Sequence, residues 1–379
     1  MIGGLERYYQ IARCFRDEDL RADRQLDFTQ VDIEASFLSQ ESFMQIIEEV
    51  VGNVMENVLG EERPVIDHVS FYDALNTYGS DKPDRRFDMT LSDLNEIFAE
   101  TEFKVFENVL AANGSLKSVV LKDQADTVSR KVSDAYTDLV KKHGLGGLVV
   151  LKMLDGQLSG SAAKFLSETE QNALVETLKL ENNDVLFIGS GSWEVYFEAM
   201  GAVRWRLAKD YDLIDESKFD YLWLVDFPMF ELGDDDQLVA RHHPFTAPKE
   251  EDVELLDTEP LKVLAQAYDL VLNGYEVAGG SMRIYDQDLQ RKMFSLIGFT
   301  DEQIQKRFGF FVDAFQYGTP PHGGIAFGLD RYAMALTHSD TIRDVIAFPK
   351  NASARCPLTN APSEPVDTQL EDLHLKINK

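Results

Sequence analysis

Two neighbouring stretches decide the fold of this chain: Arg7-Tyr-Tyr-Gln-Ile-Ala-Arg-Cys-Phe-Arg16 and Phe28-Thr-Gln-Val-Asp-Ile-Glu-Ala-Ser-Phe37. Their spacing predicts two β-strands joined by a long charged loop. Successive side chains of a strand point to opposite faces, so the second strand has an apolar and a polar face. The apolar face carries Val31, Ile33 and Ala35, and the polar face carries Gln30, Asp32 and Glu34.

The first strand and the loop add charges of both signs. Arg13 and Arg16 precede the run Asp17-Glu18-Asp19. Opposed charges on one face of a hairpin suit a ligand that carries both phosphate and cationic groups. A solvated surface hairpin has the same composition, so composition alone leaves both interpretations open.

Length and composition limit the class of protein. The 379 residues, of which 44% are hydrophobic, allow roughly two to three domains with real cores. The net charge of −29 excludes a non-specific nucleic-acid binder, which needs a broad basic surface, but leaves room for a specific RNA partner at a local basic patch. No apolar run reaches the length of a membrane span, and no signal peptide is visible. Two cysteines, Cys14 and Cys356, fit a reducing, cytosolic compartment.

The order of segments predicts a domain that is interrupted by a second one. A helix is expected from about residue 40 to 60, followed by a loop that ends at residue 84. Residues 85–218 then alternate in type, which predicts an α+β insert with its own core. There, strands are expected at 102–110, 117–122, 148–154 and 184–188, and helices at 123–142 and 162–180. Gly189-Ser-Gly-Ser192 lacks the third glycine of a dinucleotide-binding loop and predicts a strand-to-helix turn.

The remainder, 219–379, returns to the pattern of the first 84 residues. It contains an apolar strand at 221–230, the loop Arg241-His-His-Pro-Phe-Thr246 and a second apolar strand at 265–273. Helices are expected at 287–296, 301–317 and 332–337, and the last twenty residues form an acidic tail.

Several long motifs, in order, resemble those of the bacterial-type aspartyl-tRNA synthetases, a family of class II aminoacyl-tRNA synthetases. They are Phe15-Arg-Asp-Glu18 with residues 28–34, His242-His-Pro-Phe-Thr246, residues 273–281, and Gly328-Leu-Asp-Arg331. The resemblance extends from residue 1 to about 365 and includes the insert, which is similar to the GAD domain of that family. It implies an α+β fold, in which an antiparallel sheet is flanked by helices, and a cytoplasmic ligase that activates L-aspartate with ATP and transfers it to tRNA(Asp).

The resemblance also implies roles for individual residues. Arg16 corresponds to the arginine on the α-phosphate and on aspartate, and Arg331 to the arginine on the γ-phosphate. The other implied ATP contacts are Asp17, Glu18, Gln25, Glu276, Gly328, Leu329 and Asp330. Asp269 and Glu276 correspond to the Mg2+ carboxylates, and Arg283 and His242 to aspartate-binding residues. Arg21 and Arg24 are candidates for the acceptor end of the tRNA.

The sequence departs from the family at its beginning. The OB-fold anticodon domain, motif 1 and the aspartate-gripping Ser-Pro-Gln loop are not found, so we expect no anticodon reading, a weakened homodimer and impaired aspartate binding. Met1 is therefore expected to be an internal methionine of a longer protein. Two alternatives stay open: a non-catalytic fragment or paralogue that binds tRNA or a protein, and an ATP-dependent ligase acting on a small amine.

Overall fold

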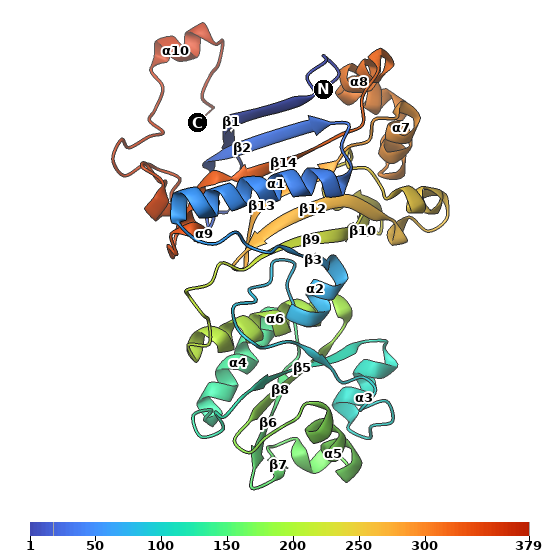
Figure 1. Cartoon of the computed structure of the whole chain (residues 1–379), viewed down its shortest axis with the longest axis vertical. Helices are drawn as coiled ribbons and strands as arrows, with labels where there is room; N and C mark the ends of the chain where they lie inside the picture. Colours follow the sequence, from blue (N-terminus) through green and yellow to red (C-terminus); the bar gives the residue numbers. More distant parts are fainter. Residues whose placement is uncertain (18, 379) are drawn as a thin grey trace.

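The computed structural model describes residues 1–17 and 19–378, and its largest element is a seven-stranded sheet (Figure 1). All neighbouring strands of this sheet are antiparallel except β3 and β9, which are parallel. In spatial order the strands are β1 (Arg7–Phe15), β2 (Asp27–Ser36), β14 (His322–Gly328), β13 (Tyr275–Met282), β12 (Leu264–Leu272), β9 (Tyr221–Pro228) and β3 (Asp67–Ser70). The predicted hairpin of residues 7–37 is confirmed as β1 and β2, which pair from Arg7 opposite Ala35 to Phe15 opposite Asp27.

One face of the large sheet is covered by helix α1 (Gln40–Val54), which continues as a π-helical turn (Met55–Leu59) and ends at Gly60. Ser39 caps its first turn by accepting a hydrogen bond from the Ser42 amide at 3.2 Å. The apolar side of α1 packs on the sheet, where Phe43 contacts Tyr268 with ring centroids 6.0 Å apart. The helix predicted for 40–60 is confirmed. Because α1 occupies the apolar face, the polar face of β2 lies on the other side of the sheet.

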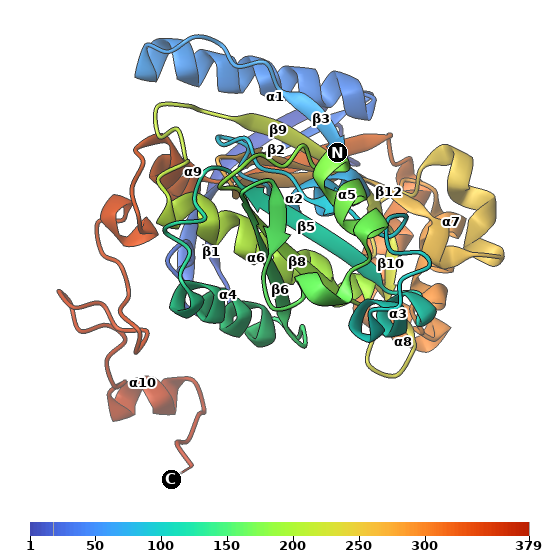
Figure 2. The same cartoon turned by 90° about the horizontal axis from the view of Figure 1, so that it is seen from below.

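The second sheet is formed entirely by residues 85–218, here called the insert, which lies at the opposite end of the molecule from α8 (Figure 1). Its strands, in spatial order, are β4 (Ser92–Asp93), β5 (Ser115–Leu121), β8 (Val185–Gly191), β6 (Leu148–Leu154) and β7 (Gln157–Ser159). Its helices are α3 (Lys104–Ala111), α4 (Arg130–Lys142), α5 (Glu168–Thr177) and α6 (Trp193–Asp210), with a 3-10 turn at Ala163–Phe165. Helices α4 and α6 lie on one side of this sheet and α3 and α5 on the other (Figure 2), and a hydrophobic cluster fills the space on each side.

Some predictions for the insert were wrong in detail. The predicted strand 102–110 is wrong, because residues 104–111 form helix α3, in which Phe106 packs on the N-cap residue Phe103 with ring centroids 4.8 Å apart. The helix predicted from 123 begins at Arg130, where Ser129 supplies the cap. The helix predicted from 162 begins at Glu168, after the capping box of Ser167 and Glu170. The turn after β8 is confirmed, since α6 begins two residues beyond Gly191.

Except for the helix in the C-terminal tail, which lies away from the large sheet, the remaining helices lie at the edges of that sheet (Figure 1). They are α2 (Phe71–Tyr78), α7 (Gln287–Leu296), α8 (Asp301–Ala314), α9 (Leu329–Leu336) and α10 (Asp367–Asp372) in the tail, with 3-10 turns at Glu250–Asp257, Pro260–Lys262, Phe315–Tyr317 and Ile342–Val345. The predicted strand 221–230 divides at Met229 into β9 and the hairpin of β10 (Phe230–Leu232) and β11 (Leu238–Ala240). The helix predicted from 332 begins at Leu329. Among the described residues, no helix is both long and apolar enough to span a membrane.

The insert and the large sheet are joined by a backbone contact between two glycines. Gly79, which ends α2 with a φ of 69°, lies against Gly201 of α6, so that a Cβ on Gly201 would fall 3.0 Å from the Gly79 Cα and closer still to its carbonyl. We predict that Gly201→Ala lowers the free energy of unfolding by about 1–3 kcal/mol, because the two backbones would have to separate. Denaturant unfolding measures this. Gly147→Ala, where a Cβ meets nothing within 4 Å, is the control, and an equal effect of both variants would refute the interpretation.

Candidate active site

The polar face of the large sheet has acidic side chains on β2 and β12 and very small residues between them. Asp32 lies opposite Ala326, which lies opposite Gly279, which in turn lies opposite Asp269. Directly opposite residues of an antiparallel sheet share a face. The two carboxylates therefore stand on either side of a floor made by an alanine and a glycine.

A β-bulge in the β12–β13 hairpin decides which side chains reach this floor. The register shifts so that Leu270 pairs with Ala278 and Val271 with Glu276, which leaves Val277 as the extra residue. Glu276 and Arg283 are seven residues apart, a separation that strict alternation would place on opposite faces. The extra residue of the bulge cancels this change of face, so Glu276, Gly279 and Ser281 lie on the same face of the sheet as Asp269. Arg283, two residues after Ser281, points to the same side.

Glycines on this floor leave space that the carboxylates occupy. A Cβ added to Gly279 would lie 2.7 Å from Oδ1 of Asp269 and 3.5 Å from Oε1 of Glu276. A Cβ on Gly324 would collide with the carboxylate of Glu34. Any larger residue at either position would displace these carboxylates.

Two adjoining pockets open over the floor, and Arg16, Gln30, Glu276 and Ala326 line both of them. The first extends toward α9 and is completed by Asp23, Arg24, Gln25, Phe28, Val277, Ala278, Gly328, Asp330, Arg331 and Ile342. The second extends toward the histidine loop and is completed by His242, His243, Thr246, Asp269, Gly279, Gly280 and Ser281. The two pockets thus unite Arg16, Arg331, Asp269, Glu276 and His242, which the sequence places up to 315 positions apart.

The first pocket has a cationic wall. The Arg16 guanidinium lies over the Phe28 ring, 4.8 Å from its centroid. Arg331, the third residue of α9, donates from Nη1 to the Glu276 carbonyl at 2.7 Å, and its Nη2 lies 3.3 Å from the Asp23 carboxylate. Asp330 accepts from the Thr29 amide at 2.7 Å, which joins the start of α9 to β2. Both arginines thus bring guanidinium groups to one space, an arrangement suited to a polyphosphate.

Arg283 lies in a neighbouring pocket with Asp32 and Glu34 rather than in the two pockets that contain Arg16. Its guanidinium stacks on the Phe245 ring, 5.1 Å from the centroid. Within the part of the chain that the structure describes, the buried Nε of Arg283 and Oε2 of Glu34 have no hydrogen-bond partner. Burial lowers the pKa of Arg283 and raises those of Asp32 and Glu34, while attraction between the arginine and the two carboxylates opposes each shift. Unpaired buried polar atoms of both signs indicate a site for a small ligand with both charges.

The two histidines of the loop occupy different surroundings. His242 packs edge to face on Phe227 at 4.6 Å, whereas His243 has Nε2 3.4 Å from Oγ of Ser281 and Nδ1 3.3 Å from Oγ1 of Thr246. Burial, helped by nearby Arg241, lowers the pKa of His242, and burial with Arg283 and His242 lowers that of His243 to about 4. Both rings are therefore neutral at pH 7. His242 therefore adds no positive charge to the pocket of the free chain.

The remaining predicted site residues differ in how close they lie to the pockets. Asp17 and Arg21 are exposed, Leu329 is outside both pocket linings, and Glu18 lies outside the described residues. Arg24 lines the first pocket. Gln25 is buried and does so too, but its amide is bound to the backbone of Lys350, accepting from N at 2.7 Å and donating to O at 3.3 Å. Gln25 thus also fixes the C-terminal segment against the loop.

Asp269 and Glu276 form the pair that a divalent cation would require. Burial and the adjacent Glu276 carboxylate raise the pKa of Asp269 well above its ordinary value. No group of three or more potential ligands was found among the described residues. Two carboxylates fit Mg2+ that arrives with nucleotide phosphates and keeps several waters, and they do not fit an all-protein cation cage.

Comparison with known proteins identifies the family. A sequence model of the tRNA synthetases class II (D, K and N) matches residues 1–352. The chain belongs to this family. It is 52% identical over its whole length to the aspartate–tRNA(Asp/Asn) ligases of Bacillus cytotoxicus and of Bacillus thuringiensis strain Al Hakam, and it spans 64% of the length of each. The Entamoeba histolytica asparaginyl-tRNA synthetase, solved with asparaginyl-adenylate, aligns with 94% of this chain and 55% of its own at 13% identity and a TM-score of 0.47.

Membership of this class II family confirms the predicted fold class, an antiparallel sheet flanked by helices. Several pocket residues were not singled out from the sequence as site residues, namely Gln30, Asp32, Glu34, His243 and Ser281. The alternation of β2 already contained a signal for the first three, because a strand packed on one side exposes every second residue to the other. No sequence signal distinguished His243 from His242.

Proposed function

We propose that this chain activates L-aspartate with ATP. In the reaction, a carboxylate oxygen of aspartate attacks the α-phosphorus, the bond from that phosphorus to the bridging oxygen breaks, and pyrophosphate leaves as aspartyl-adenylate forms. One observation carries this proposal. Arg16 lines both pockets, of which the one toward α9 also contains Arg331 and the other contains the Asp269 and Glu276 carboxylates. The named activity of the 52% identical relatives supports the same choice of amino acid.

The chemistry requires two anions to be held together while charge accumulates on phosphorus. Guanidinium groups that are already in place stabilise this charge without reorganisation. Arg16 is the group we assign to the α-phosphate and to the attacking carboxylate. Arg331 is assigned to the far phosphates, because its Nη1 is anchored on the Glu276 carbonyl. Asp269 and Glu276 would hold Mg2+, which neutralises phosphate charge when bound.

Arg283 supports aspartate as the substrate. A guanidinium binds a carboxylate through two parallel hydrogen bonds, which the amide of asparagine cannot match. Asp32 and Glu34 would face the substrate ammonium, whose positive charge would oppose the rise that burial causes in their pKa values. His242 and His243 line the second of the two pockets that contain Arg16, on the side of the histidine loop.

The later step and the assembly follow from the same proposal. The aspartyl group would pass to the 3′ end of tRNA(Asp), with the exposed Arg21 and neighbouring Arg24 facing the acceptor end. We also propose that the homodimer of the full-length family is weakened in this chain, and that the chain acts in the cytoplasm, where its two free cysteines stay reduced. The unit formed by residues 85–218 is proposed to be a GAD-like domain between catalytic parts 1–84 and 219–379.

The direct test is aspartate-dependent exchange between ATP and pyrophosphate by the purified chain. We expect exchange with aspartate, none without amino acid, and a dependence on Mg2+. A folded chain that binds tRNA yet shows no exchange at saturating aspartate would instead support a non-catalytic role.

For the substrate side chain, we predict that Arg283→Lys raises the KM for aspartate by about 100-fold while the KM for ATP changes by less than about twofold. The reason is that lysine keeps the charge but loses the two-bond fork. Initial rates of pyrophosphate exchange at varied aspartate and at varied ATP measure the two values. Arg307→Lys is the matched control, because Arg307 is an exposed arginine that also stacks on a phenylalanine, Phe299 at 5.6 Å. Unchanged aspartate dependence in Arg283→Lys would remove Arg283 from the binding site.

A further inference from the structure

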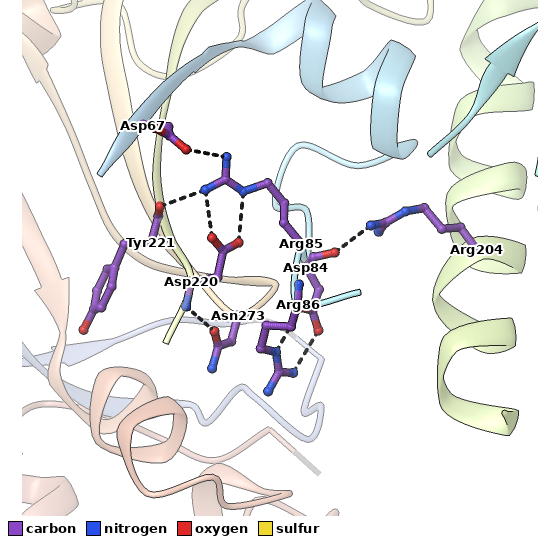
Figure 3. A network of polar contacts seen from close by, with 8 residues as sticks. All are labelled: Asp67, Asp84, Arg85, Arg86, Arg204, Asp220, Tyr221 and Asn273. Atoms are coloured by element: carbon purple, nitrogen blue, oxygen red, sulfur yellow. Dashed lines mark hydrogen bonds and ion pairs between the residues drawn. The ribbon is translucent and has the colours of Figure 1, made fainter. Parts of the chain in front are cut away.

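The turn of the β12–β13 hairpin lies in the junction between the large sheet and the insert (Figure 3). Asn273 and Gly274 form this turn with φ angles of 51° and 84°. A Cβ on Gly274 would lie 3.1 Å from the Cβ of Asp84, the last residue before the insert. The same hairpin carries Asp269 on one strand and Glu276 on the other. The turn therefore connects the strands that carry these two carboxylates to the residue that precedes the insert.

The segment that leaves the insert holds the other side of the turn. Asn273 Oδ1 accepts from the Asp220 amide at 2.8 Å, and its Nδ2 donates to the Lys218 carbonyl at 3.0 Å. Asn273 is 5% exposed, so these bonds are shielded from water. The turn is thus fixed between the segments that enter and leave the insert.

Arg85 connects these two segments to each other. Its Nε and Nη2 donate to the two carboxylate oxygens of Asp220 at 3.0 and 2.8 Å, and its Nη1 donates to Asp67 of β3 at 3.1 Å. Arg86 makes a second two-bond pair with Asp84, at 2.9 and 2.8 Å. Planar pairs of this kind restrict orientation as well as distance.

One side chain of the insert helix α6 reaches into this junction. Arg204 is 2% exposed, donates from Nη2 to the Asp84 carbonyl at 2.8 Å and from Nε to the Met89 carbonyl at 2.5 Å, and stacks on Phe87 at 4.1 Å. One turn earlier on the same helix, Gly201 meets Gly79. Helix α6 therefore fixes both ends of the loop 79–84.

We propose that Arg204 is a positioning residue for the nucleotide site. Through Asp84 it holds the β12–β13 turn, and with it the Asp269 and Glu276 carboxylates, in the place that receives the phosphates of ATP. This inference rests on the proposed function and gives the insert a part in it: its position sets the affinity for MgATP. A displacement of the turn would also move Arg331, because Arg331 is hydrogen-bonded to the Glu276 carbonyl. Arg283 lies at the other end of β13, beyond Met282, so aspartate binding should be spared.

The test compares Arg204→Met and Arg204→Lys with the matched control Arg206→Met in the full chain. Arg206 lies two residues further along α6, is exposed, and pairs with Asp210 of the same helix. We expect the Arg204 variants to weaken MgATP binding, measured by calorimetry, by about tenfold, and to raise the KM for ATP while leaving the KM for aspartate within about twofold. Backbone hydrogen exchange of a peptide covering 272–277 should accelerate in the same variants. Arg206→Met should change none of these values.

The outcomes separate this inference from the function on which it rests. If the unaltered chain binds no MgATP, the proposed function fails, and the exchange of peptide 272–277 still decides whether Arg204 holds the turn. Folded Arg204 variants with unchanged turn exchange and unchanged MgATP affinity would overturn the inference, as would equal losses of ATP and aspartate affinity. If both Arg204 variants fail to fold, Gly274→Ala tests the same contact from the hairpin side, with the same expected results and the same overturning ones.

Discussion

Arg16→Ala is expected to reduce the rate of aspartate-dependent ATP–pyrophosphate exchange by about 10³-fold with little change in stability. Among the described residues that line both pockets, Arg16 is the one cation. It is also exposed and stacks on Phe28, so its removal costs little packing. Losing a single preorganised donor to a developing negative charge costs about 10²–10³ in rate, and Arg16 is proposed to serve two anions at once. Steady-state exchange with thermal unfolding in parallel measures both effects.

Two further variants decide whether charge or geometry at Arg16 matters. Arg16→Lys should recover part of the lost rate, because the charge remains while the planar fork is lost. Arg7→Ala, an exposed arginine at the other end of β1, should retain the full rate. If Arg16→Ala and Arg7→Ala exchange at similar rates, Arg16 is not the α-phosphate residue.

Strands β1, β2, β9 and β12 of the large sheet and its covering helix α1 were predicted from the sequence because their patterns are local, whereas β3, β14 and the order of the strands were not predicted. The alternation of Val31, Ile33 and Ala35 with polar residues, and the helical spacing within 40–60, each arise from one segment that packs on one side. The insert was harder to predict. Residues 102–110 contain phenylalanines that suit either a strand or a helix, and the contact of Phe106 with Phe98, outside this segment, favours the helix.

The site residues were predicted by motif rather than by geometry, so the local structure around them was not predicted. Nothing local to residues 276–283 announces the bulge at Val277 that puts Glu276 and Ser281 on one face. Gln25 has a backbone partner 325 positions away, which no local pattern could indicate. Asp32 and Glu34 were visible as a polar face, but the pocket that they share with Arg283 depends on two other strands, β14 and β13.

Asp269→Asn is expected to abolish exchange and, at the same time, to stabilise the folded chain. Burial and the neighbouring Glu276 raise the pKa of Asp269, so the ionised carboxylate is unfavourable in the folded state. Asparagine removes that charge at nearly constant volume. We therefore expect a gain of about 1–2 kcal/mol in the free energy of unfolding at pH 7, together with a loss of about 10²–10³ in exchange rate because a proposed Mg2+ ligand is gone.

The pH dependence gives this prediction a direction. The pKa of Asp269 is higher in the folded than in the unfolded state, so the folded chain keeps this proton to a higher pH. The folded state therefore loses stability as the pH rises from 3.8, the ordinary pKa, through the raised pKa of the folded state. Below 3.8 both states are protonated and the penalty is absent. The advantage of Asp269→Asn over the unaltered chain should thus be largest at neutral pH and should vanish near pH 4. Urea unfolding at several pH values measures it.

Asp234→Asn, in the exposed acidic turn between β10 and β11, is the matched control. It should alter neither the exchange rate nor the slope of the free energy of unfolding with pH.

An Asp269→Asn variant that is less stable than the unaltered chain at pH 7 would show that the carboxylate is compensated in the folded state. In that case Asp269 would belong to the structural framework of the hairpin. A stabilised variant with an unchanged exchange rate would remove Asp269 from the cation site while leaving its strain with Glu276 established. If Asp269→Asn both stabilises the chain and lowers the exchange rate, the Asp269 carboxylate is needed for activity although it destabilises the free chain. That result would show that the repulsion between Asp269 and Glu276 is relieved when a cation and its nucleotide fill the site.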